Sequence, residues 1–541
     1  MKRIDYIVVG GGSAGCVLAA RLSEDPAVNV LLLEAGDDER KYMRIAMPLA
    51  WRDAFRDPDL SWGFMTEPEP FADGRSIAAP RGKVLGGSNS VNGMMYMRGH
   101  KLDYDDWAAR GLPGWDYEGV LPYYRRAENN WRGASRYHGA QGPLTTMRHV
   151  PDDFIYPCVI ETAETLGYKH LDDFHDAEGE GFSAPDFNIH AGTRGSTVAR
   201  YLRPAMSRPN LTVRVQVLVR RLIIENGRCV GVDAESGGRL ETLRAERETI
   251  LAAGAFNSPQ LLQLSGVGDP ADLEPHGIKV RHPLPGVGAN LQEHHSTAVI
   301  YGASGEFCFD RQLRLDRLAL SVLEWKMFRT GCIGKAPVSA QGLVRTRPDL
   351  DRPNLQMLIS PVSIFARPWF PGWRAGEGHR ISMACVLLHP ESRGKVSLRS
   401  ADPRAAPRIL LNLLQAEGDR RALRDIIRFV RRFFEARPAC GLVAEEQFPG
   451  AGIVDDVQLD AHLRKTIGTA MHPTSTCAMG VDAMAVVDGQ LRVHGLSGLR
   501  IADASIMPSI VGGNTNAPTV MIAEKAVDLI LSRGTRGNDV R

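Results

Sequence analysis

The sequence lacks the marks of several large protein classes. Its 65 Lys and Arg nearly balance 63 Asp and Glu, so a net charge of +2 offers little to nucleic acid. Its eight cysteines form no CxxC pair and no regular spacing, which argues against a disulfide scaffold or zinc ribbon and for a reducing compartment. No apolar run approaches the roughly 20 residues of a membrane span. With the first expected element at Ile4, no room remains for a signal peptide. We therefore expect a soluble, cytoplasmic protein, with peripheral association with a membrane left open.

The N-terminus predicts a dinucleotide-binding unit. The buried strand IDYIVV (4–9) runs into GGGSAG, followed by a helix and a second buried strand, VNVLLLEAG (28–36). Gly10 suits the tight turn, Gly12 lets the backbone approach a pyrophosphate, and Gly15 permits close packing of helix on strand. Glu34 ends the second strand, where a carboxylate accepts hydrogen bonds from ribose hydroxyls. The alternative is a glycine-rich turn without a ligand, and this motif alone does not separate FAD from NAD.

Later segments predict further elements. Asn226-Gly227 lies between two apolar runs, as in a β-hairpin. Residues 247–266 suggest a strand, a turn and a helix capped by Ser258, with Pro259 at its first position. Residues 313–328 and 420–434 have the spacing of amphipathic helices. For the arginine-rich second helix a solvated basic face is favoured over a membrane-surface role.

Two more clusters suit a ligand site. Gly86-Gly87 in PRGKVLGGSNSVNGMMYMRGH (80–100) removes side chains where something flat would approach, unless this is a plain surface loop. In residues 499–530 a short strand ends at Asp503, and a helix is expected to start near Pro518. Thr515 or Asn516 could simply cap that helix, or its positive end could face an electron-rich group. His472 stands directly before Pro473, and taken alone such a residue is more often a packed histidine than a catalyst.

Five ordered motifs resemble the glucose–methanol–choline (GMC) flavin oxidoreductases, from Tyr6 to Ile530. The overall look is most similar to the bacterial branch with choline dehydrogenase-like and alkyl-alcohol dehydrogenase members. The motifs are PRGKVLGGSNSVNG, GAFNSPQLLQLSGVG (254–268), LPGVGANLQEH (284–294), HPTSTCAMG (472–480) and the 499–530 stretch.

This resemblance implies the roles of individual residues. His472 would be the base toward a substrate hydroxyl, with Asn516 as its partner and Asn514 as the second choice. Val91 stands where covalently flavinylated members carry the linking His, so FAD is expected to bind non-covalently. Residues matched to the FAD site are Gly10, Gly12, Ser13, Ala14, Gly15, Glu34, Ala35, Arg81, Gly86, Gly87, Ser88, Asn92, Gly93, Met94, Val219, Asp503 and Ala504.

The sequence departs from the usual pattern of the family at two further positions. Glu293 replaces the Asp usual before His294, and Asn89 replaces a Ser. The pair His294-His295 suggests a metal at first sight, but adjacent side chains diverge and no further ligand has metal spacing, so no metal is expected.

The expected fold is α/β, with a Rossmann-like FAD-binding domain and a second α+β substrate domain built on an antiparallel sheet. The FAD-binding domain is discontinuous and takes residues 1–150, 196–305 and 455–541. The substrate domain takes residues 151–195 and 306–454 and is backed by the two amphipathic helices.

The expected reaction is oxidation of an alcohol to the aldehyde, with hydride transfer to the flavin and electrons passed to a quinone or dioxygen rather than NAD. A neutral aliphatic or aryl primary alcohol is favoured over choline, because no carboxylate can be placed beside the aromatics Phe365, Trp369, Phe370 and Trp373. Those aromatics could form a pocket, a lid or ordinary core. The alternatives are an oxidase using dioxygen, a choline dehydrogenase, a hydroxynitrile lyase on the same scaffold and a non-enzymatic nucleotide-binding protein.

Overall fold

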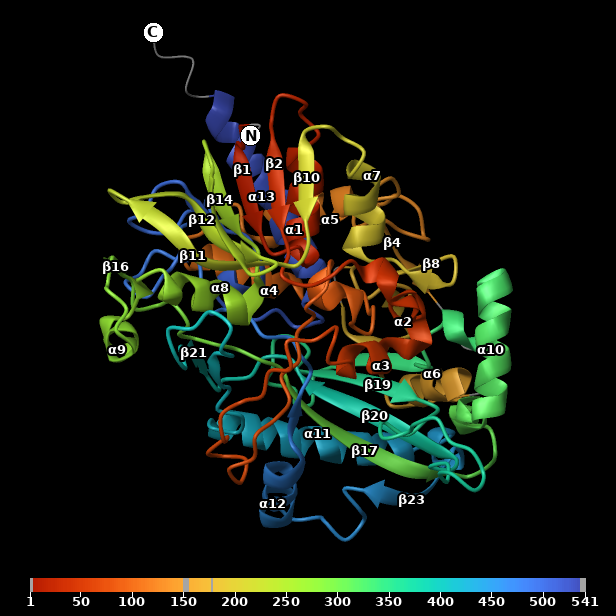
Figure 1. Ribbon diagram of the computed structural model, residues 1–541. Coiled ribbons are helices and arrows are strands. Elements are labelled where there is room, and N and C mark those ends of the chain that lie inside the picture. The colour runs from red at the N-terminus through yellow and green to blue at the C-terminus, as the bar shows by residue number, and fades with distance from the viewer. Residues whose placement is uncertain (1–2, 149–154, 177–178, 536–541) are drawn as a thin grey trace.

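A computed structural model describes residues 3–148, 155–176 and 179–535 of the 541-residue chain. Two sheets dominate it (Figure 1), a parallel sheet in the upper half of that view and an antiparallel sheet in the lower half. The parallel sheet has the order β10-β2-β1-β14-β25. Its strands are β10 (Leu211–Arg214), β2 (Val30–Leu33), β1 (Tyr6–Val9), β14 (Glu248–Leu251) and β25 (Leu499–Ile501).

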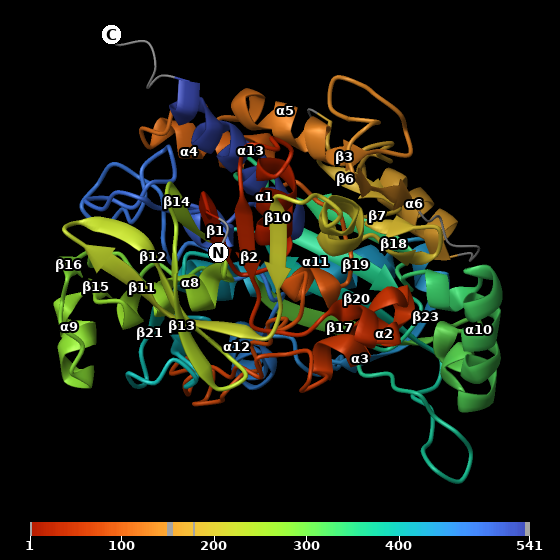
Figure 2. The ribbon, with the colours of Figure 1, turned by 45° about the horizontal axis from the view of Figure 1, so that its top comes forward.

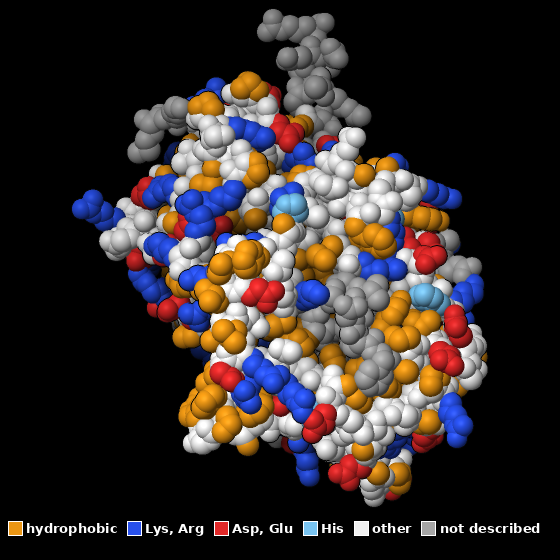
Figure 3. Space-filling model, turned by 90° about the vertical axis from the view of Figure 1, so that its right-hand side faces the viewer, with side chains coloured by type: hydrophobic (Ala, Val, Ile, Leu, Met, Phe, Trp, Pro, Cys, Tyr) orange, Lys and Arg blue, Asp and Glu red, His pale blue; other side chains and the backbone are white. Residues whose placement is uncertain are grey.

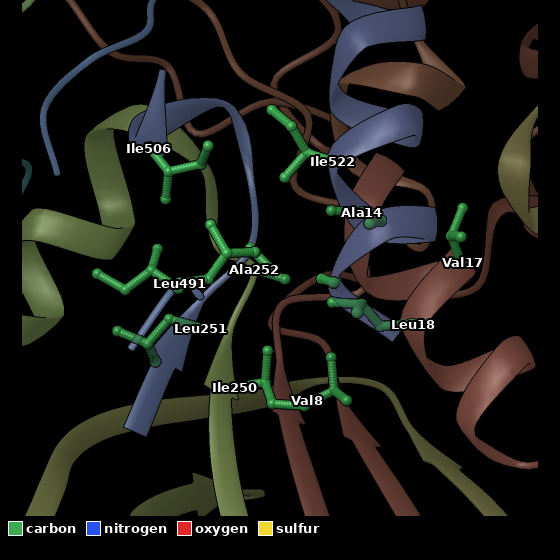
Figure 4. Packing of buried hydrophobic residues seen from close by; sticks show 14 of the residues in the cluster. Val8, Ala14, Val17, Leu18, Ile250, Leu251, Ala252, Leu491, Ile506 and Ile522 are labelled. Atoms are coloured by element: carbon green, nitrogen blue, oxygen red, sulfur yellow. The ribbon is translucent and has the colours of Figure 1, made fainter. Parts of the chain in front are cut away.

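The parallel sheet forms because its strands are short apolar runs buried on both faces. In β1 all four residues are buried, and Val8 is in register with Leu32 on one side and Ile250 on the other. Helices α1 (Ser13–Leu22) and α13 (Asn516–Thr535) pack together against this sheet, and Ile522 and Leu18 lie in the same core (Figure 4). A three-stranded sheet lies on the other side (Figures 1 and 2), formed by β11 (Val217–Glu225), β12 (Arg228–Ser236) and β13 (Arg239–Arg244).

The second large sheet has seven strands and is antiparallel at every pairing. Helix α11 (Glu417–Glu435) runs along it, with its apolar face buried. The strands are β23 (Val443–Phe448), β17 (His295–Ala303), β20 (Arg380–Leu387), β19 (Leu355–Ser360), β18 (Ala340–Val344), β6 (Gly181–Ser183) and β24 (Gly468–Thr469).

Both amphipathic helices expected from the sequence are present, as α10 (Leu315–Phe328) and α11. The polar side of α11 is paired: Arg424 Nη1 lies 2.7 Å from Asp460 Oδ1 on α12 (Asp456–Thr466). Because α11 packs its apolar side on the antiparallel sheet, that side is not available to a membrane.

The strand pairings place two of the expected domain boundaries differently. Strand β17 pairs over eight residues with β20, so 295–303 belongs to the antiparallel sheet and not to the cofactor-binding part. Strand β24 pairs with β17, and α12 contacts α11, so the final segment of the cofactor-binding part starts after Thr469 rather than at 455.

Helix α8 (Gly254–Leu264) also begins earlier than expected, which places Ser258 and Pro259 inside it. The Gly254 amide donates to Asp503 Oδ2 (2.9 Å) and extends the helix backwards. Pro259 has no N–H for the Ala255 carbonyl, and the Thr476 hydroxyl donates to that carbonyl instead (2.6 Å). A side chain from the HPTST segment thus makes an internal proline tolerable.

Candidate active site

A cavity of about 690 Å³ reaches from the carboxyl ends of the parallel strands to the antiparallel sheet. This edge of a parallel sheet is where open α/β folds bind ligands. Of the residues matched to a cofactor from the sequence, only Gly15 and Gly86 do not border it. Those that do are Gly10, Gly12, Ser13, Ala14, Glu34, Ala35, Arg81, Gly87, Ser88, Asn92, Gly93, Met94, Val219, Asp503 and Ala504.

The glycine turn has the shape that a pyrophosphate requires. A Cβ on Gly15 would lie 1.8 Å from the Gly10 carbonyl oxygen, so that glycine serves the packing of α1 on β1. A Cβ on Gly12 would meet only the Ala252 carbonyl oxygen, at 3.9 Å, so protein packing does not explain this glycine. Gly12 borders the cavity, where a bare backbone lets a phosphate approach the N-terminus of α1.

Glu34 connects the glycine turn with the loop that follows β2. Its Oε2 accepts from the Gly11 amide and its Oε1 from the Gly36 amide, both at 2.7 Å. Burial raises its pKa to about 7, against the lowering by the Gly36 and Gly11 amides. Each carboxylate oxygen has a further lone pair and Glu34 borders the cavity, so the residue can bind a ribose while holding the turn.

The 80–93 segment closes the cavity from another side. Gly87 has φ +54°, and a Cβ there would lie 2.9 Å from the Gly12 Cα, so the two glycine loops touch. Val91 is buried and also borders the cavity, without a side chain that can bond to a flavin. These loops leave a cradle of backbone and small side chains.

His472 lies at the junction of the two sheets, in a chain of hydrogen bonds. His294 Nε2 is 3.0 Å from the Leu388 carbonyl oxygen, and His294 Nδ1 is 2.9 Å from His472 Nδ1. The Asn514 amide nitrogen is 3.1 Å from His472 Nε2, and Gln356 Nε2 donates to Asn514 Oδ1 at 3.1 Å.

These partners assign the protons. A carbonyl only accepts, so His294 carries its proton on Nε2 and accepts at Nδ1. His472 must then donate from Nδ1, which leaves the Nε2 lone pair unprotonated and facing Asn514. The chain of contacts therefore presents one basic nitrogen to the cavity.

Burial lowers the pKa of His472 to about 3, and the Arg81 charge acts in the same direction. Burial and His472 lower the pKa of His294 well below its usual range. Both imidazoles are consequently neutral near pH 7, as proton acceptance requires.

The backbone around His472 is also fixed. Met471 has φ +65°, a conformation that a methionine rarely adopts. Arg81 Nη2 donates to the Met471 carbonyl (2.7 Å), and Glu293 Oε1 accepts from the His472 amide (2.6 Å). Burial raises the pKa of Glu293 to about 8 and lowers that of Arg81 to about 10. These two side chains hold the unusual turn that aims the imidazole.

The structure corrects the expected partner of His472, which is Asn514 and not Asn516. Asn516 Oδ1 accepts from Ser13 Oγ and from Asn89 Nδ2, both at 3.0 Å. Asn516 is the first residue of α13, and its helical position turns the side chain toward the glycine loops. Its buried Nδ2 has no partner among the described residues, so it is a donor facing the cofactor end of the cavity.

Glu293, His294 and Gln356 have roles in this site that the sequence alone did not predict. His294 and Glu293 were visible in LPGVGANLQEH, but that motif does not say which distant segment they meet. Gln356 lies on β19 in a run, LQMLIS, without any motif, and its side chain is fully buried. What marks Gln356 as a functional residue is the complete burial of its polar side chain, and burial cannot be inferred from the sequence.

The aromatics expected to form a pocket or lid do not border the cavity. Phe365, Phe370 and Trp373 are exposed, and Trp369 Nε1 donates to the Asp310 carbonyl (3.0 Å). Only their neighbours 366–368 reach the cavity wall.

A dinucleotide cradle at a parallel-sheet edge, with a neutral histidine at its far end, defines a nucleotide-dependent oxidoreductase site. The chain belongs to the GMC oxidoreductase family: models of its N- and C-terminal parts match residues 4–296 and 390–523. It is a FAD-dependent flavoprotein that acts on CH–OH groups.

Named relatives cover nearly the whole chain. Oxygen-dependent choline dehydrogenase of Photobacterium profundum is 41% identical over 532 residues, covering 97% of this chain and 93% of that protein. Mitochondrial choline dehydrogenase of Mus musculus is 40% identical, with 97% and 89% covered. The crystal structure of pyridoxine 4-oxidase from Mesorbium loti matches with a TM-score of 0.86 at 28% identity, with 97% and 98% covered.

Proposed function

We propose that this enzyme oxidises a neutral primary alcohol with an apolar tail to the aldehyde, with non-covalently held FAD. The observation that carries the proposal is the hydrogen-bond chain that leaves His472 Nε2 unprotonated at the cavity. The glycine turn and Glu34 would hold the pyrophosphate and ribose of FAD, and Asn516 would donate to it. FAD, when bound, supplies the acceptor for the hydride of the alcohol carbon.

The residues of the chain would handle the proton. His472 accepts the hydroxyl proton at Nε2, while its Nδ1 proton stays on the bond to His294. Asn514 donates from its amide to the substrate oxygen and limits the poses in which the carbon can react. His294 fixes the tautomer of His472, and Gln356 fixes the orientation of the Asn514 amide.

The cavity wall favours a neutral substrate. The carboxylates that border the cavity, among described residues, are Glu34, Asp53 and Asp503. Glu34 is bound to the glycine turn, and Asp503 accepts from Ser258 Oγ at 2.6 Å. Asp53 is exposed on α3 (Trp51–Arg56).

Aromatic rings border the cavity beside Asp53, among them Trp51 and Phe55, but a cation of the protein already covers the ring of Trp51. The guanidinium carbon of Arg52 lies 5.2 Å from the ring centroid of Trp51, so a protein cation takes the place a trimethylammonium would need. The strands of the antiparallel sheet contribute neutral residues only, namely Ser296 of β17, Gln356, Leu358 and Ser360 of β19, and Ala384 and Val386 of β20.

A matched pair of alcohols tests the substrate class. Choline and 3,3-dimethylbutan-1-ol have the same shape and differ in a charged nitrogen against a neutral carbon. Mixed with the FAD-loaded enzyme without oxygen, the neutral alcohol should bleach the flavin at least ten-fold more efficiently than choline. Choline as the better substrate would make the enzyme a choline dehydrogenase like its named relatives. If no alcohol bleaches the flavin while a cyanohydrin is cleaved, the lyase alternative holds.

The electron acceptor needs its own comparison. We expect a quinone-type acceptor, because the sequence motifs resemble the alkyl-alcohol dehydrogenase members of the family, whereas the names of the relatives, an oxygen-dependent choline dehydrogenase and an oxidase, favour dioxygen. The reduced enzyme should reoxidise faster with a soluble quinone than with air-saturated buffer. The reverse order would identify an oxidase.

A further inference from the structure

Helix α10 stands at the edge of the molecule (Figure 1). It carries apolar side chains both toward the protein and toward solvent. Its inner side packs normally: Leu318 and Val322 border the active-site cavity, and Trp325 is buried beside Met47. Its outer side is equally apolar yet faces solvent. The exposed fractions are 69% for Leu320, 54% for Leu323, 63% for Met327 and 64% for Phe328.

A surface helix normally has its apolar side chains on the one side that faces the core, so a second apolar stripe on the outer side needs an explanation. Residues 320, 323 and 327 follow helical spacing, so they form one stripe rather than scattered exposures. The loop 363–374 extends this surface, because Leu315 N donates to the Trp369 carbonyl (2.9 Å) and brings exposed Phe370 and Trp373 beside the start of α10. We define the outer side of α10 and this loop together as the α10 surface.

The charges of the α10 surface are strongly one-sided. Segments 311–329 and 363–374 contain seven Lys and Arg and two Asp and Glu, in a chain whose total is nearly balanced. Of the two carboxylates, Asp316 pairs with Arg314 at 2.6 Å. Arg317, Lys326 and Arg374 are exposed around the apolar stripe. Figure 3 turns this face to the viewer and shows hydrophobic side chains at the surface among blue basic ones.

From this combination we propose that the α10 surface docks the enzyme on an anionic lipid bilayer. Apolar side chains would enter the acyl boundary while the surrounding cations meet lipid phosphates. Among the described residues, no helix is long and apolar enough to cross a membrane.

The charge pattern also argues against two other partners for the α10 surface, namely a second copy of this chain and an acidic protein. Two copies that met through this surface would bring two sets of cations together, which disfavours self-association. An acidic protein would satisfy the cations, but a bilayer satisfies the cations and the apolar stripe at once. Docking in this way would place the wall of the cavity formed by Leu318 and Val322 next to the lipid.

Vesicle flotation of the FAD-loaded enzyme tests this proposal, with flavin absorbance as the readout. The enzyme should float with vesicles of equal parts phosphatidylglycerol and phosphatidylcholine, and less with phosphatidylcholine alone or at high salt. Combining Leu320→Ser, Leu323→Ser and Met327→Ser should reduce vesicle partitioning at least ten-fold. Combining Arg317→Gln, Lys326→Gln and Arg374→Gln should reduce it roughly a hundred-fold.

A matched control removes three exposed apolar side chains elsewhere. Leu240→Ser, Val457→Ser and Val481→Ser change residues that are 64%, 77% and 71% exposed outside the α10 surface. This variant should float like the parent, and all variants should keep FAD content and activity on a water-soluble alcohol.

Three results would overturn the proposal: no flotation of the parent, equal loss in the control, or a parent dimer that only the α10 variant dissociates. The last would assign the surface to a second copy. Capture of an acidic protein without vesicle binding would likewise reject the bilayer.

Discussion

The surroundings of His472, rather than the intrinsic pKa of an imidazole, keep this side chain in the neutral form that can accept a proton. An ordinary histidine has a pKa near 6.5 and would be partly charged at neutral pH. Burial lowers this pKa to about 3, and His472 Nδ1–H donates a hydrogen bond to the neutral His294. The lone pair on Nε2 is then available throughout the physiological range.

We predict that His472→Ala keeps bound FAD and slows anaerobic flavin reduction by roughly 10²–10⁴-fold, the usual worth of a positioned general base. In the parent the reduction rate should rise with pH through one ionisation that lies below 6.5, because the neutral form reacts and its pKa is lowered. Stopped-flow reduction per mole of bound flavin, measured across pH, checks both. A variant rate within a few-fold of the parent, or an inflexion above 6.5, would end the assignment.

Two asparagines two residues apart should behave differently. Asn514→Ala removes the donor at His472 Nε2, so reduction should slow at least ten-fold with FAD occupancy unchanged. Asn516→Ala removes the partner of Ser13 and Asn89, so FAD should bind more weakly while the flavin that remains bound reduces at a near-parental rate. Reduction rates and FAD titrations of both variants are needed. If Asn516→Ala slowed reduction and Asn514→Ala weakened FAD binding instead, Asn516 would be the partner of His472, as its spacing in the sequence suggested.

At the scale of elements, the local sequence was sufficient to predict a helix or strand where the hydrophobic pattern or the turn residues of that segment alone determine it. The buried run of β1, the Asn226-Gly227 hairpin and the two amphipathic helices were all predictable for that reason. Helix α8 was harder, because its true start depends on Asp503 and its internal proline on Thr476. Those residues lie more than two hundred positions away, beyond any local pattern.

Glu34 links two elements, since it directly follows β2 and its carboxylate holds the turn that leads into α1. We predict that Glu34→Ala weakens FAD binding at least ten-fold and lowers the free energy of unfolding by about 1–3 kcal/mol, because the buried Gly11 and Gly36 amides lose their acceptor. Excess FAD should recover the fold. Glu24→Ala, on an exposed carboxylate of the same region, is the control. Unchanged FAD affinity in Glu34→Ala would place the ribose elsewhere.

At the scale of the whole molecule, the site exists only because two sheets meet. Glu293 and His294 precede β17 of the antiparallel sheet, whereas Asn514 precedes α13 on the parallel sheet. The motifs predicted which residues matter, and spacing along the chain suggested Asn516. Spacing does not report that a helix N-terminus turns one asparagine toward a phosphate cradle and leaves its neighbour toward a histidine.

Bound FAD would join three separate parts of the chain around the cavity. Its proposed contacts run from the glycine turn to the 80–93 loops and α13, so binding should stabilise the folded state by mass action, about 4 kcal/mol at a thousand times Kd. We predict that acid precipitation leaves no flavin with the protein, because Val91 offers no covalent link. The refolded apo-enzyme should unfold at a lower temperature that rises with added FAD and not with NAD⁺. Flavin retained in the acid pellet would contradict non-covalent binding. A shift with NAD⁺ equal to that with FAD would mean that the cradle reads only the shared adenosine diphosphate, and that the cavity beyond it does not select a flavin.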